Sequence, residues 1–71
     1  MNTEITAEIG GTVWKILTEE GDTVPAGAVL MILESMKMEI PVIAEDDGTV
    51  ISLAVREGQP VEPGTTLVTM A

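Results

Sequence analysis

The chain repeats itself once, at an offset of 37 residues, and this repeat constrains the fold more than any other feature of the sequence. Residues 7–33 align with residues 44–70 without a gap and share ten identical positions. In the first copy these are Ala7, Glu8, Gly11, Thr12, Val13, Glu20, Gly21, Val24, Gly27 and Leu30. Two copies are too few for a solenoid, in which at least three repeats stack. The repeat therefore predicts a single domain, residues 1–71, whose two halves complete one core.

Each half is expected to consist of short strands joined by tight turns. Residues 11–18 and 48–55 are rich in β-branched and aliphatic residues and show no helical periodicity. Residues 20–27 and 57–64 are dense in Gly and Pro, which favour turns because Gly tolerates positive φ and Pro fixes φ. The predicted fold class is all-β. The expected strands are 3–8, 11–18, 22–24, 29–35, 38–43, 48–55, 59–61 and 65–70.

Composition excludes several classes of function. The formal charge of −9 would repel nucleic acid and anionic membranes. The absence of Cys and His removes thiolate chemistry, the commonest general base and the commonest metal ligands. A chain of 71 residues has little room for an enclosed active-site cleft. We therefore expect no enzyme and no metal site. A cytoplasmic location is expected because the start of the chain lacks a secretory signal and no apolar run could span a membrane.

The core must be built almost entirely from aliphatic side chains and Met. Trp14 is the only aromatic residue in the chain. A lone Trp within a strand normally packs inside, because its side chain carries a large apolar area. Trp14 is therefore expected to lie in the core.

Two apolar strand-like runs in the middle of the chain flank a short polar insert. Folding residues 29–43 about Met36-Lys37 pairs Ser35 with Met38 and makes the apolar runs coincide, which predicts a two-residue hairpin loop. Such loops favour Asn-Gly or Asp-Gly, because both central residues adopt positive φ. Met-Lys lacks this chemistry, and forcing ordinary residues into the left-handed region costs about 1–2 kcal/mol each.

Two more features of the same hairpin oppose stability. The predicted register places Glu34 opposite Glu39, and like charges across strands are unfavourable. Met36 and Met38 would lie at a tip where apolar surface gains little burial. Local rules that fail together at one place often mark a functional site. The alternative is a longer and looser loop in which Lys37 is an ordinary solvated lysine.

Residues 34–39, Glu-Ser-Met-Lys-Met-Glu, resemble the biotinyl-attachment motif of biotin carboxyl carrier proteins, in which Ala or Ser precedes Met-Lys-Met with acidic residues nearby. The resemblance covers essentially the whole chain and is closest to stand-alone biotin/lipoyl attachment proteins. It implies a flattened β-barrel of two four-stranded antiparallel sheets, related by a pseudo-twofold axis (a barrel-sandwich hybrid). It also implies that Lys37 receives biotin, at the end of the barrel opposite the termini.

The resemblance further implies three partner enzymes and no catalytic residue in the domain itself. A biotin protein ligase would form biotinyl-adenylate, and Nζ of Lys37 would attack its acyl carbon after a ligase group has removed the amine proton. A biotin carboxylase would then carboxylate the biotin ring, and a carboxyltransferase would pass the carboxyl group to an acceptor, as in acyl-CoA carboxylases. The domain is thus expected to be a carrier, monomeric when isolated.

The residues around Lys37 have two readings each. Met36 and Met38 would give partner enzymes a soft, adaptable contact, or they are semi-buried strand residues. Glu34 and Glu39 would orient a partner or keep the tip soluble. Ser35 belongs to the motif without a further assigned role.

Two other functions stay open on the sequence alone. A lipoyl carrier of a dehydrogenase or acyltransferase complex has the same implied fold, but its lysine is typically preceded by Asp and followed by Ala. An unmodified barrel-sandwich interaction domain would use the hairpin only as structure. The mass of the protein from its native host would separate these possibilities from biotinylation.

Overall fold

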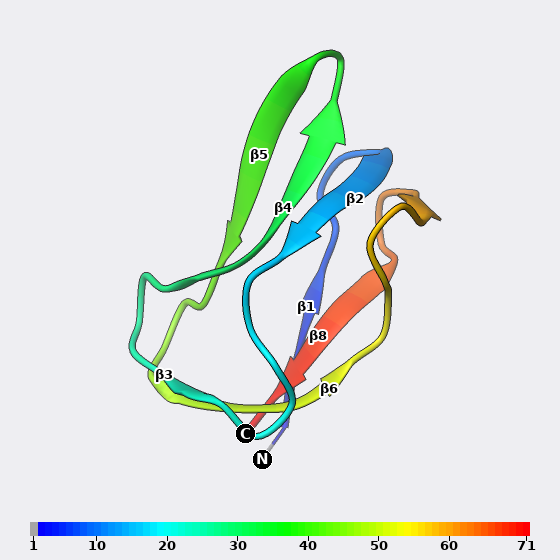
Figure 1. Ribbon diagram of the computed structural model, residues 1–71. Coiled ribbons are helices and arrows are strands. Elements are labelled where there is room, and N and C mark those ends of the chain that lie inside the picture. Colours follow the sequence, from blue (N-terminus) through cyan, green and yellow to red (C-terminus); the bar gives the residue numbers. More distant parts are fainter. Residues whose placement is uncertain (1) are drawn as a thin grey trace.

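Eight short strands form two four-stranded antiparallel sheets in the computed structural model, which describes residues 2–71 (Figure 1). One sheet has the strand order β1-β8-β6-β3 and the other β5-β4-β2-β7. The fold class predicted from the sequence is therefore confirmed. The strands are β1 (Thr3–Thr6), β2 (Gly11–Ile16), β3 (Thr23–Val24), β4 (Val29–Ser35), β5 (Met38–Ile43), β6 (Gly48–Leu53), β7 (Pro60–Val61) and β8 (Thr66–Met70).

The repeat in the sequence appears in the structure as a pseudo-twofold relation between the sheets. Strands β2 and β3 begin 37 residues before β6 and β7, which matches the offset of the repeat. Replacing each strand by the one four places along the chain, cyclically, turns the order β1-β8-β6-β3 into β5-β4-β2-β7. Each sheet takes two strands from each half, so neither half has a complete sheet of its own.

Residues that recur in the repeat bind the two halves to each other. The amide of Gly21 donates to the Val50 carbonyl, and the amide of Gly58 donates to the Val13 carbonyl, each at 2.7 Å. The φ angles of Gly21 and Gly58 are 97° and 88°, a region that costs Gly no steric energy. Glycine is therefore favoured in both copies because the backbone adopts positive φ at the position whose amide donates to the opposite half.

The core lies between the two sheets and contains no buried polar or charged residue within the described part of the chain. Both sheets contribute side chains to it, including the consecutive pairs Leu30-Met31 of β4 and Leu67-Val68 of β8. Leu30, Met31, Leu33, Leu67, Val13, Val50 and Val68 are its largest fully buried side chains. Aliphatic residues and Met thus fill the core, as the composition predicts.

Trp14 is not in the core, and the prediction that it would be is wrong. Its side chain is 42% exposed, whereas the neighbouring Val13 is fully buried. The pairing of β2 with β4 shifts register between Val13 and Lys15, so Trp14 occupies a β-bulge. Because Val13 faces the core, the alternation of a strand already turns the next side chain, Trp14, to the outer face of the sheet, and the bulge leaves Lys15 on the same outer face. The Nζ of Lys15 lies 5.7 Å from the centroid of the Trp14 ring, within the range of a cation–π contact.

Replacing Trp14 by Ala should therefore cost less stability than replacing Val13 by Ala. Truncating a fully buried large aromatic to Ala lowers the free energy of unfolding by about 3–5 kcal/mol. Because Trp14 is about half exposed, Trp14→Ala should lower it by only about 1 kcal/mol. Truncating fully buried Val13 should cost about 2 kcal/mol, because it leaves a cavity. Urea denaturation followed by circular dichroism measures both. A larger loss for Trp14→Ala than for Val13→Ala would contradict the exposed position of the ring.

Candidate functional site

The β4–β5 hairpin forms one end of the molecule, and both chain ends lie at the other (Figure 1). Its strands pair Ser35 with Met38, Glu34 with Glu39 and Leu33 with Ile40. The predicted register and the two-residue loop at Met36-Lys37 are thus confirmed. The alternative of a longer, looser loop is wrong for this structure.

The turn itself adopts the strained geometry that the sequence suggested. The φ angles of Met36 and Lys37 are 52° and 64°, and these are the two non-glycine residues with positive φ within residues 2–71. Positive φ at both central positions is the signature of the type I′ turn, whose twist matches that of the flanking strands. Each of these residues raises the free energy of the folded state by about 1–2 kcal/mol relative to an ordinary backbone conformation. The backbone conformation of Met36 and Lys37, which form the apex of the hairpin, therefore lowers the stability of the folded domain.

The apex side chains extend into solvent. Met36 is 87% exposed and Met38 is 64% exposed, so the reading of both as semi-buried strand residues is wrong. Lys37 is also exposed. An apolar side chain in water gains nothing from folding, whereas a flexible thioether can adapt to a partner surface. The structure thus presents the Lys37 amine between two exposed, deformable apolar side chains.

Glu34 and Glu39 face each other in the second cross-strand pair below the turn, and both are exposed. Like charges at opposed positions of an antiparallel pair are destabilising. The two carboxylates therefore place negative charge next to the turn, and this charge does not stabilise the fold. Whether they orient a partner or maintain solubility stays a prediction.

At the base of the hairpin, Ser35 and Glu34 each make a close contact with the segment at the start of β2 that the sequence did not predict. The Oγ of Ser35 donates to the Gly10 carbonyl oxygen at 2.7 Å. A Cβ on Gly11 would collide with the carbonyl oxygen of Glu34, so β2 can approach β4 this closely only with Gly there. The repeat held a signal for the second contact, because Gly11 and its counterpart Gly48 both lie in strands rather than turns.

Lys15 is the other lysine of the chain and has a different setting. It lies within β2, beside the bulge, with its amine over the Trp14 ring. A strand that is paired on both sides offers no protruding apex. Lys15 therefore serves as an internal control for any chemistry assigned to Lys37.

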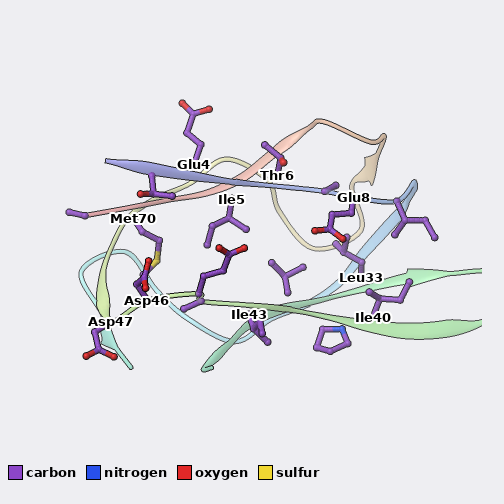
Figure 2. Close-up of a pocket in the computed structure, with 18 residues that line it drawn as sticks. Glu4, Ile5, Thr6, Glu8, Leu33, Ile40, Ile43, Asp46, Asp47 and Met70 are labelled. Atoms are coloured by element: carbon purple, nitrogen blue, oxygen red, sulfur yellow. The ribbon is translucent and has the colours of Figure 1, made fainter. Parts of the chain in front are cut away.

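An open groove of about 790 Å³ runs along the side of the molecule where β1 and β5 form the edges of their sheets. Figure 2 shows Ile5 of β1 pointing across it toward the strands that carry Leu33 and Ile40. The sequence did not predict this groove. Glu4, Glu8, Glu45, Asp46 and Asp47 are among its lining residues.

Two of these carboxylates have a structural partner. Glu4 accepts a hydrogen bond from the Thr66 hydroxyl at 3.2 Å, and Asp47 accepts one from the Ala26 amide at 2.7 Å. Lys37 is not among the lining residues of the groove. The groove and the apex are therefore separate features.

Within residues 2–71, no three acidic side chains come together in an arrangement that could hold a metal ion. The same residues contain no helix that is long and apolar enough to cross a bilayer. The hairpin apex thus stands out through its exposed amine, its paired methionines and its strained backbone.

Comparison with known proteins identifies relatives that match most of the chain. The family model described as "Biotin-requiring enzyme", for biotin/lipoyl domains, matches residues 1–70. The biotin carboxyl carrier protein of Streptococcus mutans is 46% identical over 65 residues, which is 92% of this chain and 50% of that protein. The biotin/lipoyl attachment protein of Bacillus subtilis is 36% identical over 67 residues, covering 94% of this chain and 92% of that protein.

Solved structures agree with the sequence relatives. A single-chain, multi-domain long-chain acyl-CoA carboxylase contains a region that superposes on 99% of this chain with a TM-score of 0.94 and 34% sequence identity. This chain spans only 7% of that carboxylase and half of the Streptococcus mutans carrier protein. The fold, the match over residues 1–70 and the relatives agree, and the chain belongs to the biotin/lipoyl attachment domain family.

Proposed function

We propose that this domain is a biotin carrier whose Lys37 is biotinylated by a biotin protein ligase. The observation that carries the proposal is the geometry of the apex. Lys37 is exposed at the second position of a two-residue turn, and the flanking Met36 and Met38 are exposed as well. The relatives named biotin carboxyl carrier protein and acyl-CoA carboxylase support the same class of function.

Lys37 suits this role because lysine combines a nucleophilic amine with a long flexible stem. The lone pair of Nζ attacks the acyl carbon of biotinyl-adenylate, and a C–N bond forms while the bond from that carbon to the phosphate oxygen breaks. The amine proton passes to a base of the ligase, and AMP leaves. Removal of the lysine charge changes the formal charge of the domain from −9 to −10.

The rest of the domain holds this amine outside the barrel. Once attached, biotin supplies a ring that accepts a carboxyl group at a biotin carboxylase and gives it up at a carboxyltransferase. The hairpin keeps the point of attachment at one end of the molecule, where a partner enzyme can enclose it. The domain supplies no catalytic group in this scheme.

Co-expression with a biotin protein ligase tests the proposal. We expect one biotinyl group per chain by intact mass, located at Lys37 by peptide mapping, and no label in the Lys37→Arg variant. Lys15 serves as the internal control, because it lies in a strand with its amine over Trp14. Label on Lys15, or no label under conditions that modify a known carrier, would contradict the proposal. Modification by a lipoate ligase instead would favour the lipoyl alternative.

A further inference from the structure

Ser35 lies at the base of the hairpin apex and contacts the rest of the barrel through its hydroxyl. Ser35 and Met38 form the last cross-strand pair before the turn. At this level the Ser35 hydroxyl crosses to the Gly10 carbonyl oxygen, a contact between residues 25 positions apart in the chain. Ser35 therefore lies where the hairpin leaves the barrel.

The acceptor of this hydrogen bond is itself held in place. Gly10 directly precedes β2, and the pairing of Gly11 with Val61 joins this segment to β7. Val61 is 5% exposed and belongs to the core. A Cβ added to Gly10 would lie 3.6 Å from Pro63 Cδ and from the Val61 carbonyl oxygen, so the backbone at Gly10 packs against β7 and the turn that follows it. The Ser35 hydroxyl thus links the hairpin to a fixed part of the molecule.

The close approach of Gly11 to β4, beside Ser35, recurs at the symmetry-related place. Gly48 repeats the close approach of Gly11, because its Cβ would lie 2.5 Å from the Ala71 carbonyl oxygen. The close glycine approach therefore belongs to the duplicated fold in both halves.

We infer that Ser35 is a positioning residue for Lys37. Its hydroxyl anchors the base of the hairpin and limits how far the apex can swing before a ligase encloses it. The inference rests on the proposed biotinylation of Lys37, because it assigns Ser35 a part in that reaction. A ligase that receives an ordered apex has less conformational freedom to remove on binding.

The Ser35→Ala variant tests this inference, with Thr18→Val as a matched control. Thr18 also donates its hydroxyl to a backbone carbonyl of β4, that of Leu30 at 3.3 Å, but at the end of the strand away from the apex. Valine keeps the shape of threonine. We expect both variants to retain the β-sheet circular dichroism spectrum, with melting temperatures lowered by no more than several degrees.

The two variants should differ in the local readout. A hydrogen bond of ordinary net strength shifts an opening equilibrium by about 3- to 10-fold. Hydrogen exchange of the amide of Met38, which pairs with Ser35 across the strands, should therefore accelerate by that factor in Ser35→Ala and stay unchanged in Thr18→Val. The KM for the carrier in biotin transfer should rise by a similar factor in Ser35→Ala, with kcat within about twofold of the parent. Ser35→Thr, which keeps the hydroxyl, should restore both values.

Equal exchange rates and equal KM values in Ser35→Ala and Thr18→Val would overturn the inference. Exchange is measured on the unmodified protein, so it decides the anchoring role even if the parent chain is not biotinylated. Absence of label on the parent would instead remove the proposed function. The two failures are therefore distinguishable.

Discussion

Exchanging the two turn residues, Met36→Lys together with Lys37→Met, should nearly abolish biotin transfer while leaving the fold intact. Both positions already have positive φ and both are exposed, so the exchange introduces no new backbone strain and buries no new group. The composition and charge of the chain are unchanged. The circular dichroism spectrum and the melting temperature of the variant should match those of the parent.

The loss of transfer follows from the direction of the side chains. The two central residues of the turn adjoin different strands, so the exchange moves the amine by several Å. Reacting atoms must come within about 3–3.5 Å, and a displacement of 1 Å can cost about 100-fold in rate. Initial rates of labelling by a biotin protein ligase measure the effect.

Met36→Ala is the control for loss of the methionine, because it leaves Lys37 in place. Met36→Ala should retain most of the labelling rate if the position of the lysine amine determines that rate. Comparable labelling of the exchanged variant and the parent would show that the ligase reads a lysine beside methionines, without regard to turn geometry.

Gly11→Ala should be the most destabilising single methyl addition in the vicinity of the hairpin. The new Cβ would collide with the backbone carbonyl oxygen of Glu34, which cannot move without disturbing the pairing of β2 with β4. Overpacking of this kind costs about 3 kcal/mol at its upper end. A domain of this size has a total stability of roughly 4–11 kcal/mol, so the variant should melt more than about 10 °C below the parent.

Gly10→Ala is the neighbouring control with the opposite expectation. The nearest atoms to its added Cβ are Pro63 Cδ and the Val61 carbonyl oxygen, both at 3.6 Å, which is ordinary contact. The restriction of the unfolded chain by Ala can even raise stability by about 0.4–1 kcal/mol at a compatible site. Thermal melts of the two variants should therefore shift in different directions or by very different amounts. Similar melts would mean that the approach of β2 to β4 is looser than the structure shows.

The sequence predicted the strand layout well because the repeat and the turn residues supply local signals. The segments with Gly and Pro became the turns with positive φ at Gly21, Gly27, Gly58 and Gly64. The hairpin register followed from matching two apolar runs, since a slip of one residue would turn every side chain to the wrong face. Both signals depend on residues that are close in sequence.

The features that the sequence did not predict depend on how distant strands cross. Trp14 lies outside the core because its neighbour Val13 takes the inward position in β2, and two adjacent apolar residues do not by themselves indicate which of them faces inward. The Ser35 bond joins the hairpin to a loop that precedes β2, and the groove arises from the facing edges of β1 and β5. Lys37 could be identified from the sequence because the residues of its turn are unusual for a two-residue hairpin loop. The hydrogen bond from Ser35 to Gly10 could not, because it joins residues 25 positions apart and no local sequence pattern indicates it.

The pairing of Thr3 with Met70 places the two ends of the domain side by side, at the opposite end from Lys37 (Figure 1). The longest dimension of the molecule is 32 Å, whereas the lysine stem and the acyl chain of the proposed biotin group would together reach on the order of a dozen Å. If a linker at either end is the pivot, rotation of the whole barrel carries the amine over a wider arc than the arm alone can sweep. Rotation of the barrel as a rigid body would then set the distance covered between two active sites, and the modified lysine side chain would only have to enter each active site.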